Sequence, residues 1–137
     1  MKRTEIFFPF EPKPKGRPRM TRRGRAYTPK KTHDYEKLIS DFYKENCTDY
    51  YDSAIKVSLV FYMPIPKSTS KKKRVLMECG EIKCTTHTGD ADNLTKAVTD
   101  ALNGVAYEDD CLITELHIKK RYGSSAGTEM VISEDID

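Results

Sequence analysis

The chain has 137 residues, of which 37% are hydrophobic and 33% charged, with a formal net charge of +3 at pH 7. This length suits one domain with one modest core, and the composition is not that of a disordered protein. No apolar run long enough to cross a membrane and no hydrophobic signal segment occurs, so we expect neither membrane insertion nor secretion, and a cytoplasmic protein.

The first half of the chain predicts a strand, a long helix and a second strand. Residues 4–9 form a short apolar run that ends in a proline, which cannot continue a β-ladder. Thr28 and Pro29 favour a helix start, with Thr28 as the cap and Pro29 in the first turn. The helix is expected over 30–46, and residues 55–63 alternate as a strand with a buried face. The apolar stripe of the helix is Tyr35, Leu38, Ile39, Phe42 and Tyr43.

A basic segment separates the first strand from the first helix. Between residues 13 and 31 there are nine Lys or Arg residues and no acidic residue. Repeated Pro and Gly exclude a regular helix here, so we expect a flexible loop. Such cations repel one another unless a polyanion is near, which favours a nucleic acid over a merely solvated surface. The residues predicted to contact it are Lys13, Lys15, Arg17, Arg19, Arg22, Arg23, Arg25 and Tyr27.

A second helix is expected after the strand at 55–63. The Ser-Thr-Ser run at 68–70 is able to cap a basic helix over 71–77, which ends near Gly80. Its lysines either touch a nucleic acid or keep the surface soluble. Residues 82–88 follow as a loop or a short edge strand.

The last part of the chain predicts a helix and a hairpin. The helix spans 92–102 and stops at Asn103 and Gly104, which both tolerate the left-handed conformation. Strands over 111–122 and 128–133 flank a Gly-Ser-rich turn and are expected to pair with each other. Residues 1–137 therefore predict a single α/β domain of the α+β type, with a small mixed sheet and two to three helices on one face.

Carboxylates gather around one lysine at the last helix. Helical spacing puts Asp92, Lys96 and Asp100 near one face, while Leu94, Val98, Ala101 and Leu102 turn towards the core. Carboxylates brought together without matching cations are expected to bind a hard divalent cation such as Mg²⁺. The alternative is structural, with Asp92 as a helix cap, Lys96 paired to an acid, and Asp109 and Asp110 in a polar turn.

These acids predict a metal-dependent phosphodiesterase site. Asp90 and Asp92 come from a loop and a helix start, and Asp110 comes from the lead-in to a strand. Lys96 would neutralise the transition state or protonate the leaving oxygen. The sequence has no phosphate-binding loop, no dinucleotide-binding glycine motif and no nucleophile elbow, which argues against a nucleotide-driven motor or a dehydrogenase.

The four cysteines are irregularly spaced, so we expect reduced thiols rather than a disulfide framework. Cys79, Cys84 and His87 lie close together and raise structural zinc as an alternative. Ordinary thiols are favoured, because the paired C-x-x-C spacing is missing and only three ligands are local.

The segment from Asp90 to Gly104, with Tyr107-Glu108-Asp109-Asp110 after it, closely resembles the signature of the RusA family of Holliday-junction resolvases. The stretches 14–19 and 26–29 are similar to members of that family too. The resemblance implies a homodimeric endonuclease, dependent on Mg²⁺ with Mn²⁺ as a substitute. Such an enzyme nicks two strands of a four-way DNA junction symmetrically in recombination and repair, and is often carried by phages or prophages.

Position by position, the resemblance implies a metal-binding triad of Asp90, Asp92 and Asp110, with Lys96 as the catalytic lysine. Asp110 is a better match to the family than its neighbour Asp109, and the role of Asp100 stays open. Two alternatives remain from the residues themselves. One is a non-catalytic DNA-binding module that uses the basic segment, and the other is a nuclease that acts on flaps or other branched DNA.

Overall fold

A four-stranded mixed β-sheet forms the centre of the computed structural model, which describes residues 2–16, 19–27, 29–86 and 89–136. Strand β6 (Gly127–Glu134) pairs antiparallel with β1 (Arg3–Phe8) and with β4 (Ile55–Pro64), and β4 pairs parallel with β5 (Ile113–Gly123). The expected strand positions are confirmed to within a few residues. In spatial order the strands are β1, β6, β4 and β5.

The predicted pairing of the last two strands is wrong, because β4 lies between them. Leu59 of β4 is opposite Ile118 of β5 on one side and Met130 of β6 on the other. Residues 124–126 therefore cross the end of β4 instead of closing a hairpin. Every second side chain of β4 from Ile55 to Met63 is buried, so this strand belongs in the sheet interior with partners on both edges.

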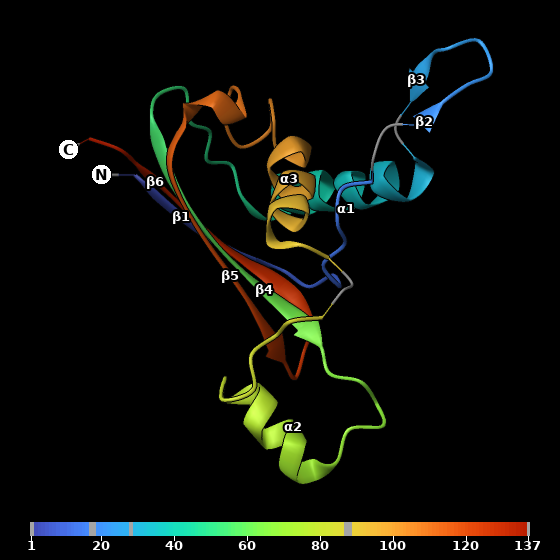
Figure 1. Ribbon diagram of the computed structural model, residues 1–137. Coiled ribbons are helices and arrows are strands. Elements are labelled where there is room, and N and C mark those ends of the chain that lie inside the picture. The colour runs from blue at the N-terminus through green and yellow to red at the C-terminus, as the bar shows by residue number, and fades with distance from the viewer. Residues whose placement is uncertain (1, 17–18, 28, 87–88, 137) are drawn as a thin grey trace.

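Two helices cover one face of the sheet, and a third lies at its end. Helices α1 (Lys30–Asn46) and α3 (Ala91–Ala101) are on the same side of the sheet, and α2 (Lys71–Glu78) stands beyond the end where β4 finishes (Figure 1). The result is one α+β domain, with only two of its three described helices on the predicted face. No helix in the described ranges has the length and apolar character that a membrane crossing needs.

The core fills the space between α1, α3 and the sheet. All four residues expected to face inward from the last helix are buried, with Leu94 and Val98 fully enclosed. In α1 the prediction for Leu38 is wrong, since this side chain is 49% exposed. The buried positions of α1 are Thr32, Tyr35, Ile39 and Tyr43.

The N-cap of α2 is the predicted residue, whereas the start of α1 differs from the expectation. Ser70 caps α2 as predicted, and its Oγ accepts a hydrogen bond from the amide of Lys73 at 3.3 Å. At α1, Pro29 is itself the N-cap rather than a first-turn residue. The predicted cap Thr28 lies outside the described residues.

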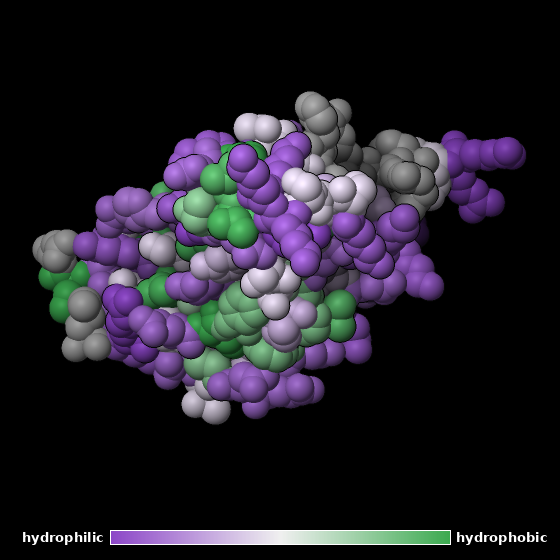
Figure 2. All heavy atoms as spheres, turned by 90° about the horizontal axis from the view of Figure 1, so that it is seen from below, coloured by the Kyte–Doolittle hydropathy of each residue, from purple (hydrophilic) through white to green (hydrophobic). Residues whose placement is uncertain are grey.

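Part of the basic segment forms a small β-ribbon instead of a flexible loop. Strands β2 (Arg19–Met20) and β3 (Ala26–Tyr27) pair antiparallel, and the amide of Thr21 donates to the carbonyl of Arg25 at 2.9 Å. Gly24 has a φ of 78°, a conformation that other residues adopt only with strain. We call residues 19–27 the basic hairpin. Figure 1 shows it projecting away from the sheet, and its tip is strongly hydrophilic at the right of Figure 2.

Candidate active site

Helix α3 supplies the central lysine of the site. The apolar side of the helix faces the core, so its opposite side presents Asp92 and Lys96 towards β5. Lys96 Nζ donates to Asp100 Oδ1 at 3.0 Å, one helical turn further on. The structure thus confirms that Lys96 and Asp100 share a face.

The two neighbouring acids before β5 have different surroundings. Asp110 Oδ2 lies 3.8 Å from Lys96 Nζ, and the Asp110 side chain is 32% exposed. Asp109 Oδ1 accepts a hydrogen bond from the amide of Asp110 at 2.9 Å and caps the short 3₁₀ turn Asp110–Leu112. The structure therefore places Asp110, rather than Asp109, beside the lysine.

An open cavity of about 370 Å³ lies between α3 and β5. Asp92, Lys96 and Asp110 line its polar side, together with the hydroxyl residues Thr95 and Thr99. The β5 segment lines the other side with the apolar residues Ile113, Leu116 and Ile118 and with the polar residues Thr114 and Glu115. An ammonium group between carboxylates at the wall of an open cavity suits a phosphate-containing substrate, because the phosphate can reach the cation from solvent.

The charge on Lys96 is maintained by its neighbours. The hydrogen bond to Asp100 and the negative charge of that carboxylate raise the pKa of Lys96, and the charge of Asp110 adds to the effect. Partial burial raises the pKa of Asp110, although the positive charge of Lys96 opposes this shift. Lys96 is therefore an ammonium at neutral pH.

The three predicted metal ligands are not assembled into a metal site. Within residues 2–16, 19–27, 29–86 and 89–136, no three His, Cys, Asp or Glu side chains come close enough together to hold a metal ion. Asp90 is the exposed N-cap of α3 and does not line the cavity that Asp92 and Asp110 share. Their oxygen atoms are the donor type that Mg²⁺ prefers, but their placement does not show a binding site.

The cysteine residues are free thiols, with Cys79 exposed and Cys84 buried. His87, the third ligand of the zinc alternative, lies outside the described residues.

A comparison with known families decides the classification. The family model described as Endodeoxyribonuclease RusA matches residues 9–133. The chain belongs to the RusA family. It is also 32% identical over 130 residues to a protein of Bacillus subtilis (strain 168) named Uncharacterized protein YqaN, covering 90% of this chain and 91% of that protein. The predicted resemblance is confirmed, and the RusA match spans both the basic segment and the acidic site.

The predicted DNA-binding residues of this RusA protein occupy different environments. Lys13 is exposed before the basic hairpin, whereas Lys15 is partly buried in ion pairs with Glu36 and Asp100. Arg17 lies outside the described residues, as do the side chains of Arg19 and Tyr27. The three arginines of the hairpin turn are exposed, namely Arg22, Arg23 and Arg25.

Sequence patterns missed two residues that support the RusA site from outside α3. Lys120 of β5 donates to the carbonyl oxygens of Gly89 at 3.0 Å and Thr86 at 3.2 Å, which ties the segment before Asp90 to the sheet. Tyr107 is fully buried, and its hydroxyl donates to the carbonyl of Thr99 at 2.6 Å. Alternation along β5 puts Lys120 on the same side of the strand as Leu116 and Ile118, where a charged side chain is unexpected. This is the sequence signal that could have found it.

Replacing Tyr107 by phenylalanine is expected to destabilise the fold by about 1–3 kcal/mol, because the carbonyl of Thr99 at the end of α3 loses its hydrogen-bond partner in the interior. Chemical denaturation of the wild type and the variant measures this difference. Tyr50→Phe is the control, since the Tyr50 side chain is 44% exposed and its replacement should change stability by less than about 0.5 kcal/mol. Equal stability of Tyr107→Phe and wild type would contradict the role of this bond.

Proposed function

We propose that this RusA-family protein is a magnesium-dependent, structure-selective endodeoxyribonuclease. It resolves Holliday junctions by paired, symmetric nicks in recombination and repair. Membership of the RusA family supports the endodeoxyribonuclease activity, and the four-way junction is the substrate that we propose for it. The observation that carries it is the ammonium of Lys96, held 3.8 Å from Asp110 at the wall of the open cavity.

The residues have separate roles in this proposal. Asp90, Asp92 and Asp110 provide oxygen donors for Mg²⁺, with Mn²⁺ as a substitute, and the bound metal would polarise the phosphate and activate water. Because the three carboxylates are not assembled as a metal site here, we assign no order of steps to the metal. Lys96 stabilises the negative charge that develops on the phosphate. The exposed arginines of the basic hairpin neutralise the DNA backbone on the substrate arms.

The proposed enzyme acts as a homodimer. Two coordinated incisions in strands of like polarity need two active sites, and a two-fold symmetric pair of chains matches the symmetry of a four-way junction. Sedimentation equilibrium of the purified protein, with and without junction DNA, measures this assembly. A single chain bound per junction at saturation would contradict it.

The proposed substrate is tested by a single gel assay with a synthetic four-way junction, a flap and a linear duplex. We expect paired nicks in the junction with Mg²⁺ or Mn²⁺, none with EDTA, and at least about 100-fold slower cleavage of the duplex. Faster cleavage of the flap would favour the alternative branched substrate. Salt-sensitive binding without nicking under either ion would instead identify a non-catalytic DNA-binding module.

A further inference from the structure

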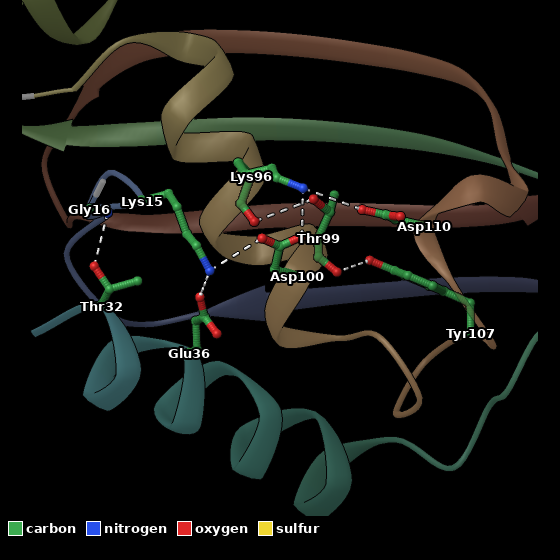
Figure 3. A network of polar contacts seen from close by, with 9 residues as sticks. All are labelled: Lys15, Gly16, Thr32, Glu36, Lys96, Thr99, Asp100, Tyr107 and Asp110. Atoms are coloured by element: carbon green, nitrogen blue, oxygen red, sulfur yellow. Dashed lines mark hydrogen bonds and ion pairs between the residues drawn. The ribbon is translucent and has the colours of Figure 1, made fainter. Parts of the chain in front are cut away.

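Lys15 joins the basic segment to both helices of the site. Its ammonium group forms ion pairs with Glu36 of α1 and, at 3.2 Å, with Asp100 Oδ2 of α3. The Lys15 side chain is 22% exposed, while Lys13, two residues earlier, is exposed to solvent. Figure 3 shows Lys15 lying between the two helices, with its amine directed at both carboxylates. Lys96 also has two carboxylate neighbours but is 57% exposed, whereas the enclosed Lys15 ammonium has little surface left for a phosphate.

Asp100 connects Lys15 to the lysine of the site. Its Oδ2 faces Lys15, and its Oδ1 accepts the hydrogen bond from Lys96. The Asp100 side chain is only 18% exposed, so its orientation is set by these two lysines rather than by solvent. Lys96 itself has a long flexible side chain that is 57% exposed, and Asp100 holds its ammonium at 3.0 Å, closer than the other neighbouring carboxylate, Asp110 at 3.8 Å.

The backbone around Lys15 is held in place as well. The amide of Lys15 donates to the carbonyl of Asn93 in α3 at 3.0 Å, and the amide of Gly16 donates to Thr32 Oγ1 in α1 at 2.9 Å. A Cβ atom at Gly16 would lie 2.6 Å from that oxygen, so glycine permits this close approach. The segment before the basic hairpin is thus fixed to α1 and α3 at neighbouring residues.

We propose that Lys15, supported by Glu36, is a positioning residue that acts through Asp100 to hold Lys96 over the cavity. In this role Lys15 orients the reacting site and makes no phosphate contact. The inference rests on the proposed nuclease function and adds a physical link between the basic segment and the catalytic lysine. It also gives Asp100 a role, as the carboxylate shared by the two lysines.

Two lysines of the same segment separate positioning from DNA binding. Lys15→Met is expected to lower the single-turnover cleavage rate at saturating protein by about 10-fold or more, because a small displacement of a catalytic group has a large effect on rate. Its junction affinity in EDTA, and the salt dependence of that affinity, should stay close to wild type. Lys13→Met should instead weaken junction binding and make the salt slope smaller by about 0.9, as expected for the loss of one phosphate contact.

The matched control is Lys37→Met. Lys37 lies on α1 in an exposed ion pair with Asp41 at 3.5 Å, outside the proposed site, so its replacement should leave the rate and the affinity within about 2-fold. If Lys15→Met instead reduces the salt slope and leaves the saturated rate unchanged, Lys15 is a phosphate contact and the proposal falls. Should Lys15→Met melt below the assay temperature, Glu36→Gln weakens the same ion pair and is measured in the same way.

The route through Lys96 is tested in a second background. If Lys15 acts only by placing Lys96, adding Lys15→Met to Lys96→Met causes no further loss of cleavage rate. A further 10-fold loss in the double variant would overturn the proposed route. A general loss of folded protein would also be revealed here, because it would lower the rate in both backgrounds.

A stability cycle tests the link without any cleavage. Lys15→Met and Asp100→Asn are compared singly and together by chemical denaturation. The double variant should lose less stability than the sum of the two single losses, by at least about 2-fold in the folding equilibrium constant. Additive losses would remove the Lys15–Asp100 coupling and with it the proposal. If the wild type cleaves no branched DNA, the proposed function fails, while this cycle still reports on the coupling.

Discussion

Asp92→Asn and Asp110→Asn are each expected to lower single-turnover cleavage of a four-way junction on the order of 10³-fold or more. Each change keeps the size of the side chain and removes one negative charge from the wall of the cavity that contains Lys96. An amide is a poor ligand for Mg²⁺ compared with a carboxylate, so the hydrolytic step should fail while the fold survives. Asp90→Asn should behave in the same way, because the proposal gives Asp90 the same role as an oxygen donor for Mg²⁺.

Asp109→Asn provides the matched control for these variants. Asp109 is adjacent to Asp110 in sequence, but its carboxylate caps the 3₁₀ turn and does not line the cavity. Two hydrogen bonds, one from the Cys111 side chain and one from the amide of Asp110, lower the pKa of Asp109, in keeping with a local structural role. We expect Asp109→Asn to cleave within about 10-fold of wild type.

Binding and cleavage should separate in the carboxylate variants. Junction binding should persist or tighten, because each replacement removes repulsion between a carboxylate and the phosphates. Electrophoretic mobility shifts measured in EDTA give the affinity, and thermal melting confirms that each variant is folded. Wild-type cleavage by both Asp92→Asn and Asp110→Asn would exclude the proposed catalytic site.

The elements of the fold were predictable from local patterns, but their neighbours were not. Alternation at 55–63 identified β4, and helical spacing identified α1 and α3, because one face of each element is buried. The short Gly-Ser turn after β5 looked like a hairpin, since short links usually join paired strands. Alternation contains no information about which strand lies alongside, so the insertion of β4 between β5 and β6 could not be seen in the sequence.

The site was predictable to the extent that it lies within one helix. Lys96 and Asp100 pair across a single turn, as their spacing indicated, whereas the contact between Lys96 and Asp110 depends on the fold. Lys15 shows the limit most clearly. In the sequence it is one of nine cations in the acid-free stretch 13–31, and only the packing of α1 against α3 brings Glu36 and Asp100 to it. Charge patterns identify a basic segment but do not identify which of its cations are already paired.

Lys96→Met is expected to lower the saturated cleavage rate by about 10²–10³-fold, with little change in junction affinity, because it removes one positive charge at the reacting phosphate. Single-turnover rates and mobility shifts measure the two quantities, with Lys37→Met as the charge-matched control. Wild-type cleavage by Lys96→Met would show that the lysine is structural.

The pH dependence of this loss tests the state of the lysine. Asp100 raises the pKa of Lys96, so its positive charge is fully present below the ordinary lysine pKa and is lost only as the pH rises through the raised value. The ratio of wild-type to Lys96→Met rates should therefore be constant between about pH 6 and pH 9. A ratio that falls towards one across this range would mean that Lys96 loses its proton near neutrality, which would contradict a raised pKa of this lysine.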